Sequence, residues 1–285
     1  MIKEEYDVIV VGAGPGGGQC ARNIAKAGLS GLLVERFASF YDNDFSSAGM
    51  PLQGFEEFDL PEHIVGRYWK NFTLQSSNEI SRWTSKENKG VVLDFAKFRQ
   101  FLADECVAHG GDVLMGYSHI SKEYTDDDKI IAHLESKKEK KKLAIKAKLL
   151  VDATGSARKV IYDTIADQPE MEISAGVEYM IKVNDQVYDR FKDDLFFFLG
   201  DKWCYKGYSW IFPMDNNVLK VGTAKMLSKG LKKGSESLKQ ITERIIADYM
   251  KAGDAEVIDV HGGTVRSTKN MSESFYKKNI VAIGD

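Results

Sequence analysis

Short apolar runs and a helical spacing of small residues alternate in the first part of the chain. The run from Asp7 to Val11 predicts a strand that ends in a glycine-rich turn. Small or apolar residues then recur at helical spacing from about Gly16 to Ala27, and Gly28 follows where a helix C-terminus favours glycine. A second apolar run, Gly31 to Glu35, completes a βαβ unit, whose crossover we expect to be right-handed.

The middle of the chain combines one irregular segment with several regular elements. Residues Phe37 to Asp59 are rich in glycine and aromatic residues and lack a clear period, so we interpret them as a long functional loop. The lysine-rich run from Lys137 to Lys142 lies between apolar stretches and is interpreted as a solvated hairpin tip. The other predicted elements are a hairpin from Phe72 to Trp83, a helix from Ala96 to His109 that stops at Gly110-Gly111, and a strand from Lys148 to Thr154.

The pattern becomes β-rich from Ser174 to Lys225. The predicted strands are Gly176 to Val183, Leu195 to Leu199, Tyr208 to Phe212 and Val218 to Ala224, with a turn at Asp215-Asn216-Asn217 between the last two. A helix from Leu238 to Met250 and a strand from Asn279 to Ile283 follow. The sequence therefore predicts an α/β protein in which a domain with a parallel sheet is combined with an antiparallel, β-rich domain that carries helices.

Composition excludes several classes of protein. A net charge of −3 argues against a general nucleic-acid binder, which usually has a basic excess or stripe. Cys20, Cys106 and Cys204 have no CxxC spacing, which suits a reducing compartment. The N-terminus does not resemble a secretory signal, and no window is long and apolar enough for a transmembrane helix. We expect a cytoplasmic protein, with peripheral membrane contact left open.

The histidines show no metal-binding pattern. They stand at positions 63, 109, 119, 133 and 261, with no ligand spacing among them. We interpret each as a surface or capping residue and predict no metal site.

The first glycine-rich turn carries the most specific chemistry. Gly12, Gly14 and Gly17 form GxGxxG between a strand and a helix: the first allows a tight turn, the second lets a pyrophosphate approach the backbone, and the third permits close packing. Glu35 ends the next strand, where an acid can accept a hydrogen bond from a ribose hydroxyl. The predicted dinucleotide-binding residues here are Gly12, Gly14, Pro15, Gly16, Gly17, Glu35 and Arg36.

This fingerprint is shared by NAD and FAD proteins, and two later segments favour FAD. Leu149 to Gly155 resembles the second motif of two-dinucleotide-fold flavoproteins, and Asn279 to Asp285 resembles the start of their third. The resemblance implies a Rossmann-type FAD-binding domain with contacts from Gly155, Gly284 and Asp285. We expect residues 1–158 and 270–285 to form that domain and residues 159–269 a substrate domain, which strands near 68–84 join.

A strand in the β-rich half carries a motif that distinguishes among families of flavoproteins. Tyr208-Ser209-Trp210-Ile211-Phe212-Pro213, followed by Gly222, resembles the YxWxFP motif of geranylgeranyl reductases, which lines a lipid cavity beside the flavin. Alternation along a strand places Tyr208, Trp210 and Phe212 on one side as an aromatic wall. The resemblance implies that Tyr208, Trp210, Phe212 and Pro213 line the substrate pocket, with Ala48, Gly49 and Met50 near the flavin on another wall. Flavin-dependent halogenases carry a related WxWxIP motif.

Three departures from the reductase pattern stand out. Ser46 to Pro51 occupies the segment where those reductases often carry a Cys-Gly pair, so no catalytic residue is assigned. Phe95 stands where many relatives carry a cofactor-contacting arginine. The sequence stops at Asp285, before the helix that follows the third motif in the family.

Three functions remain open. The first is an FAD-dependent reductase that saturates carbon–carbon double bonds of a prenyl lipid, with NADPH or ferredoxin as candidate electron donors. The second is an FAD monooxygenase or halogenase acting on an aromatic substrate. The third is a non-catalytic fragment or half of a split flavoenzyme, which would bind FAD weakly until a complementary C-terminal polypeptide joined it.

Overall fold

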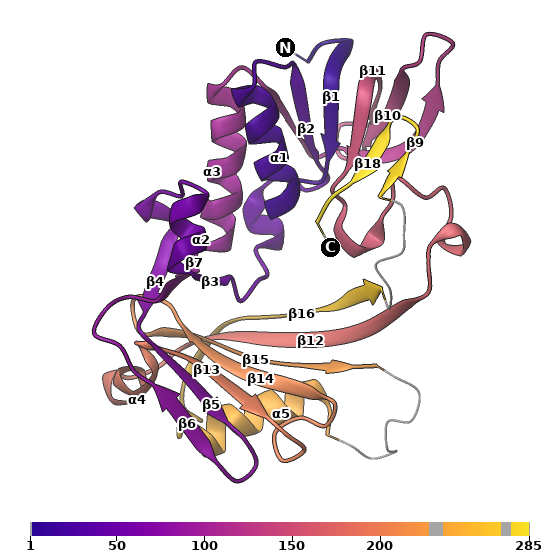
Figure 1. The fold of residues 1–285 in the computed structure, drawn as a ribbon. Helices are drawn as coiled ribbons and strands as arrows, with labels where there is room; N and C mark the ends of the chain where they lie inside the picture. Colours follow the sequence, from indigo (N-terminus) through magenta and orange to yellow (C-terminus); the bar gives the residue numbers. More distant parts are fainter. Residues whose placement is uncertain (1, 228–235, 269–274, 285) are drawn as a thin grey trace. The chain divides into compact units, whose positions relative to one another are not determined.

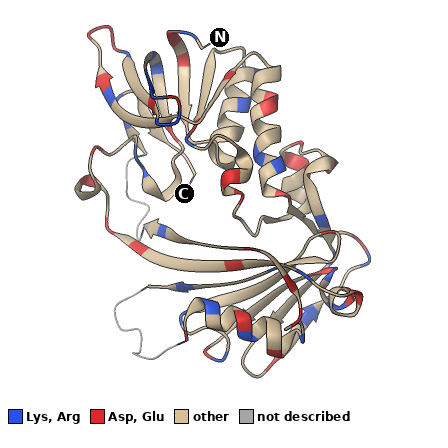
Figure 2. Ribbon diagram, turned by 180° about the vertical axis from the view of Figure 1, so that it is seen from behind, with Lys and Arg blue, Asp and Glu red and all other residues tan. Residues whose placement is uncertain are grey.

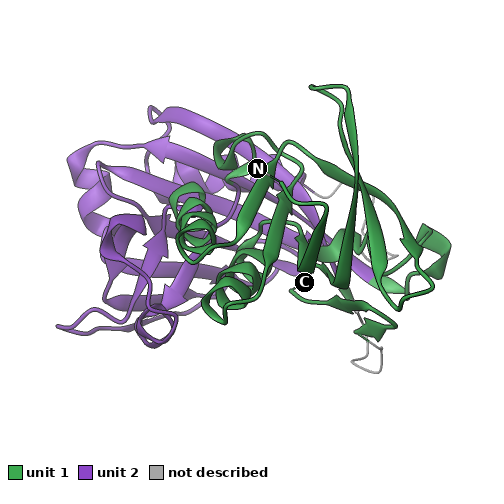
Figure 3. Cartoon of the chain, turned by 90° about the horizontal axis from the view of Figure 1, so that it is seen from above, with its two compact units in different colours: residues 1–44, 96–171, 267–285 green, residues 45–95, 172–266 purple. Residues whose placement is uncertain are grey.

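The computed structural model describes residues 2–227, 236–268 and 275–284, and these divide into two compact units. The first unit comprises residues 1–44, 96–171 and 267–285, and the second comprises residues 45–95 and 172–266 (Figure 3). The second unit thus takes residues 45–95 from the N-terminal half, a longer segment than the strands near 68–84 expected to join it. It begins again at 172, later than the expected boundary after 158.

The first unit is built on a sheet with a parallel centre. Its parallel strands have the order β18 (Ile280–Ala282), β11 (Lys141–Asp152), β1 (Glu5–Val11), β2 (Gly31–Glu35) and β8 (Asp112–Met115). The remaining strands are β9 (Ser118–Tyr124) and β10 (Ile130–Ser136), which form an antiparallel meander onto β11, and β17 (Tyr276–Lys277), which pairs with β18. Strand β2 is buried along its whole length, as expected for a central parallel strand.

Two helices pack closely against each other beside this sheet. Helix α1 (Pro15–Lys26) lies next to β1 and β2, and α3 (Phe95–Ala108) lies beside α1 (Figure 1). A Cβ atom on Gly18 would come within 3.0 Å of the Leu102 side chain, so a larger residue in α1 would force the helices apart. Buried Arg22 of α1 pairs with Glu105 of α3 at 3.2 Å. The predicted βαβ unit and the helix over residues 96–109 are therefore confirmed.

The second unit contains a large, mainly antiparallel sheet. Its strand order is β16 (Glu256–Thr268), β12 (Met171–Lys182), β15 (Val218–Met226), β14 (Gly207–Pro213), β13 (Asp194–Leu199), β5 (Asn71–Gln75) and β6 (Ile80–Trp83). A small sheet of β3 (Gly49–Pro51), β7 (Gly90–Leu93) and β4 (Val65–Trp69) accompanies it, with α2 (Leu52–Glu57) following β3. The predicted β-rich domain and its strands between 174 and 225 are confirmed, and so is the turn at Asn216-Asn217, where both φ angles are positive.

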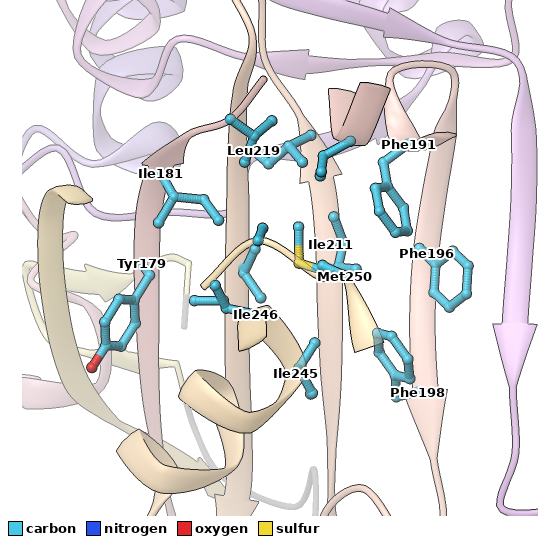
Figure 4. Close-up of a cluster of buried hydrophobic side chains, with 14 of the residues drawn as sticks. Tyr179, Ile181, Phe191, Phe196, Phe198, Ile211, Leu219, Ile245, Ile246 and Met250 are labelled. Atoms are coloured by element: carbon cyan, nitrogen blue, oxygen red, sulfur yellow. The ribbon is translucent and has the colours of Figure 1, made fainter. Parts of the chain in front are cut away.

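One side of the large sheet is covered by helices. Helix α5 (Leu238–Arg244), its continuation as the π-helical turn η5 (Ile245–Tyr249), and α4 (Asp185–Phe191) pack on it. Figure 4 shows Ile245 and Ile246 of η5 directed at Ile211 and neighbouring side chains of the sheet. Alternate residues such as Ile211 and Phe198 are completely buried here. The residues that alternate with them along each strand therefore point to the other side of the sheet.

Two segments differ from the expectation. Strand β16 was not predicted, because Val257, Ile258 and Val260 give no strict alternation and remain exposed on an edge strand. The segment from Phe37 to Asp59, interpreted as a loop, contains β3 and α2. These elements are three and six residues long, too short for a period to be visible in the sequence.

Charged residues do not gather by sign in either unit. Lysine and arginine are interspersed with aspartate and glutamate along the ribbon (Figure 2). Among the residues that the structure describes, no helix is both long and apolar enough to cross a membrane.

The helix-covered side of the large sheet predicts the cost of removing a core side chain. Phe198 is 0% exposed and lies 4.7–4.9 Å from the rings of Trp203, Phe196 and Tyr249. We expect Phe198→Ala to lower the free energy of unfolding by about 3–5 kcal/mol in urea titrations followed by circular dichroism. Val257→Ala, at a site that is 53% exposed on β16, is the control and should change it by less than about 1 kcal/mol. Equal losses would contradict this packing.

Candidate functional site

The glycine-rich turn after β1 is shaped by two close backbone approaches. Gly12 has φ +104°, and a Cβ atom there would lie 2.3 Å from the carbonyl oxygen of Ala153. A Cβ atom on Gly17 would lie 1.9 Å from the carbonyl oxygen of Gly12. Both positions therefore exclude any side chain, because backbone atoms cannot give way.

Gly14 is different from its two neighbours in the motif. No atom of the described residues lies within 4 Å of an ideal Cβ at Gly14, and its φ of −73° is open to every residue. The protein itself therefore gives no reason for glycine at this position. A ligand backbone that must pass close to the turn does give one.

The N-terminus of α1 has no side-chain cap among the described residues. Gly14 is its N-cap and makes no side-chain capping bond, Pro15 follows it, and no acidic residue occupies the first turn. The first N–H groups of a helix have no intrahelical partner and carry partial positive charge, so this end is suited to a pyrophosphate. Gly284 approaches it: its Cα lies 3.5 Å from an ideal Cβ on Gly16.

Glu35 is a buried acid that accepts three hydrogen bonds in the described part of the chain. One carboxylate oxygen accepts from the backbone N–H of Ala13 at 3.0 Å and from Arg99 at 3.1 Å. The other accepts from the N–H of Phe37 at 3.1 Å. A carboxylate can accept about four hydrogen bonds, so Glu35 can take a ribose hydroxyl in addition. Arg36 is exposed, with its guanidinium 4.6 Å from the ring centre of Phe37.

Arg99 is a site residue that the sequence analysis missed. It is 4% exposed, and besides Glu35 it donates to the carbonyl oxygens of Ala13 at 2.8 Å and Asn43 at 2.7 Å. Burial lowers the pKa of Arg99, and the charge of Glu35 opposes that effect. Arg99 lies one helical turn after Phe95, and Phe95 is the position at which the family resemblance implied an arginine. An arginine within the buried stripe of α3 was the available signal.

The second motif is organised by Asp152. Its Oδ1 accepts from the backbone N–H and hydroxyl of Thr154, and its Oδ2 accepts from the N–H groups of Val160 and Ile161 at 2.8 Å. Four hydrogen bonds to one buried carboxylate hold the loop after β11 in a single shape. Gly155 lies in this loop with φ +65°.

The three motifs converge within the first unit. Ala153 of the second motif touches Gly12 of the first, and the backbone N–H of Ile283 donates to the carbonyl oxygen of Asp152 at 2.9 Å. Gly284, with φ +78°, lies beside Gly16. Asp285, the last predicted residue of the site, lies outside the described residues.

The YxWxFP strand forms part of an aromatic surface in the second unit. Tyr208, Trp210 and Phe212 point to the side of the sheet away from α5, while Ile211 points to the helix side. The ring centres of Tyr208 and Trp210 are 5.7 Å apart. Strand alternation assigns Pro213 to the side of Ile211, so the structure does not bring it to the aromatic surface.

This aromatic surface extends across the neighbouring strands. Phe197 of β13 lies 5.2 Å from Phe212 and 5.4 Å from Phe72 of β5, and Phe72 lies 5.8 Å from Trp83 of β6. Exposure rises along this row from 5% at Phe212 to 57% at Trp83. We call Trp83, Phe72, Phe197, Tyr208, Trp210 and Phe212 the aromatic row.

The predicted second wall meets the buried end of the aromatic row. A Cβ atom on Gly49 would lie 3.1 Å from the Phe212 ring, so glycine lets β3 pass directly over it. Ala48 precedes it with φ +51°, and Met50 continues β3.

The interpretation of each histidine as a surface or capping residue is wrong for His261. Its side chain is only 10% exposed and lies between two acids of the large sheet. His119 is also mostly enclosed, and burial lowers its pKa to about 4.

Comparison with protein families finds two models that match successive parts of the chain. The model described as FAD dependent oxidoreductase matches residues 7–161, more than half of the chain. The model described as geranylgeranyl reductase catalytic domain matches residues 172–265, which lie within the second unit.

Several curated relatives share one name. A digeranylgeranylglycerophospholipid reductase of Haloferax volcanii is 28% identical over 244 residues, which cover 82% of this chain and 57% of that protein. One from Methanocella arvoryzae is 25% identical and is matched by the whole of this chain, which spans 71% of its length. The chain therefore spans between about half and three quarters of these relatives.

Solved structures establish the fold. A geranylgeranyl bacteriochlorophyll reductase-like protein from Thermoplasma acidophilum superposes with a TM-score of 0.84 at 23% identity, over 99% of this chain and 71% of that one. A flavin-dependent brominase reaches 0.75 at 17% identity, over 99% and 72%. With the converging motifs and the aromatic strand, these matches show that the chain belongs to the geranylgeranyl reductase family of FAD-dependent oxidoreductases.

Proposed function

We propose that this chain binds FAD in its first unit and a prenyl chain on the aromatic row of its second, as part of a reductase that saturates carbon–carbon double bonds of a prenyl lipid. The aromatic row is the observation that carries the proposal, because it is a long apolar surface with an open end. The name of the Haloferax relative, a digeranylgeranylglycerophospholipid reductase, supports a lipid of this class.

The described residues fit the ADP half of FAD. The uncapped N-terminus of α1 would bind the pyrophosphate through its backbone N–H groups, with Gly14 leaving room for it. Glu35 would accept a hydrogen bond from the ribose, held in place by Arg99. When bound and reduced, the flavin supplies a hydride, and the protein supplies binding, orientation and exclusion of water.

The length of the aromatic row favours a prenyl chain over a single aromatic ring. It crosses β14, β13, β5 and β6, so it offers contacts along an extended molecule. Burying each methylene of such a chain contributes about 0.8 kcal/mol. A halogenase or monooxygenase substrate of one or two rings would leave most of this surface uncovered.

FAD binding can be separated from folding at the glycine-rich turn. We expect Gly14→Val to fold like the parent but to bind FAD at least about 100-fold more weakly, a loss of about 2.8 kcal/mol, because its side chain takes the space of the pyrophosphate. Titration of the purified chain with FAD, followed by the visible spectrum, measures this. Gly17→Ala is the matched comparison and should destabilise the fold, since its Cβ would lie 1.9 Å from Gly12. Unchanged FAD affinity in Gly14→Val would refute the assignment.

Prenyl binding can be tested at an exposed member of the aromatic row. Phe72 is 36% exposed, so Phe72→Ala should leave the fold intact and weaken binding of geranylgeraniol by about tenfold, or about 1.4 kcal/mol. Quenching of tryptophan fluorescence measures the affinity. Ile80 is 56% exposed on the other side of the same hairpin, so Ile80→Ala is the control and should bind like the parent. Equal affinity in all three proteins would show that the ligand lies elsewhere.

A further inference from the structure

A buried charged pair lies within the aromatic side of the large sheet. Glu178 of β12 is 4% exposed and accepts a hydrogen bond from the indole N–H of Trp210 at 2.7 Å. Gly222 of β15 lies between them in the sheet, in register with both. A Cβ atom on Gly222 would lie 2.1 Å from the indole, so glycine lets the ring lie flat across β15 and reach Glu178. This explains Gly222 after the YxWxFP strand.

The second oxygen of Glu178 faces His261. Glu178 Oε1 lies 3.3 Å from His261 Nε2 on β16, and no other described residue satisfies this oxygen. His261 Nδ1 lies 3.2 Å from Asp259 Oδ2. His261 therefore holds the carboxylate from the side opposite Trp210, and the ion pair depends on the charge of the imidazole.

The same group of residues holds the segment that leads into β3. The ring of Phe45 stacks on the imidazole of His261 at 4.1 Å with an interplanar angle of 16°. Buried Lys220 of β15 donates to the carbonyl oxygen of Ser46 at 2.8 Å. Residues 45 and 46 are thus anchored just before Gly49 passes over Phe212.

Stability alone gives no reason for charges at this place. Removing two charges from water costs more than their attraction commonly returns, and apolar residues of similar size would fill an aromatic surface at least as well. What the pair adds is direction: a carboxylate held from one side by His261 fixes where the indole N–H of Trp210 must point.

We propose that Glu178 and His261 are positioning residues that fix the indole of Trp210 flat across Gly222 and thereby set the depth of the prenyl-binding surface. This deepens, and rests on, the proposed function. The pair acts through Trp210 and Phe45 and takes no part in bond making or breaking.

The charge of His261 makes this positioning dependent on pH. Burial lowers the pKa of His261, but the hydrogen bonds and charges of Glu178 and Asp259 raise it more, so that it stands above its ordinary 6.5. The stabilisation from the ion pair is therefore complete below pH 6.5 and is lost as the pH rises through the pKa in the folded protein. Above that pH, Glu178 loses its charged partner and Trp210 is freed to reorient.

Fluorine NMR of the full chain labelled with 5-fluorotryptophan tests the proposal without any activity measurement. The chain has four tryptophans, and the signal of Trp210 is identified as the one that is missing from the spectrum of Trp210→Phe. We expect the Trp210 signal of the parent to shift with pH at a midpoint above 6.5. We expect no such shift in His261→Gln, and a lower midpoint in Glu178→Gln, which keeps an acceptor for the indole but removes the charge. His109→Gln, at an exposed histidine of the first unit, is the control and should titrate like the parent.

Geranylgeraniol affinity gives the second measurement. It should weaken about tenfold between pH 6 and pH 9 in the parent, equivalent to about 1.4 kcal/mol, and stay constant in His261→Gln. A Trp210 signal that does not titrate in the parent, or still titrates in His261→Gln, overturns the proposal. If the Trp210 signal titrates but the affinity for geranylgeraniol does not change with pH, the pair does not set the depth of the prenyl-binding surface. If Trp210 titrates while geranylgeraniol binds at no pH, the positioning pair is confirmed and the prenyl-binding function is refuted.

Discussion

The first unit depends on the close approach of backbone at the end of β1. Gly17 must pass within van der Waals contact of the Gly12 carbonyl, and Gly12 within contact of Ala153, so neither position tolerates a Cβ atom. Because of this contact, α1 starts directly above the strand and its uncapped N-terminus faces the ligand side of the turn. The loop after β11 and the end of β18 lie at the same turn. The backbone N–H of Ala153 donates to Val11 of β1, and the N–H of Ile283 donates to Asp152 of β11. The proposed cofactor site follows from this backbone geometry and not from any single side chain.

The second unit separates stability from recognition by using the two sides of one sheet. Side chains such as Ile211 and Phe198 pack under α5 and η5 and supply the buried core. The residues between them, from Phe212 outward to Trp83, build an apolar surface that becomes progressively more exposed. A change of one residue in register would exchange the two sides, so the alternation of β14 specifies the fold and the candidate ligand surface together.

Each unit contains a buried ion pair that fixes the orientation of neighbouring groups, which a hydrophobic contact would not do. Glu35 and Arg99 connect the end of β2, the turn after β1 and the carbonyl of Asn43, with both side chains almost fully buried. Glu178 and His261 do the same for an indole ring and a loop. The two pairs differ in chemistry: an arginine stays charged across the physiological range, whereas a histidine loses its charge within it. The Glu35–Arg99 pair therefore stays charged at all physiological pH values, whereas the Glu178–His261 pair responds to pH.

Local pattern was sufficient for much of this protein. The βαβ unit and the strands between 174 and 225 could be predicted because they depend on short-range spacing. The FAD motifs could be recognised by their resemblance to known flavoproteins, with Gly12, Gly155 and Gly284 at positive φ. Strand β16 could not be predicted, since its apolar residues lie exposed at a sheet edge and lack a period. Nor could Arg99 or His261 be assigned a role from the sequence. Their partners are 64 and 83 residues away, and only the fold, which places Arg99 of α3 at the end of β2 and pairs β16 with β12, brings the charges together. Sequence determined the elements that have a clear local period and the glycine motifs that identify the cofactor, because these are local properties. Tertiary structure alone decided which buried charges meet, because that depends on which distant segments become neighbours.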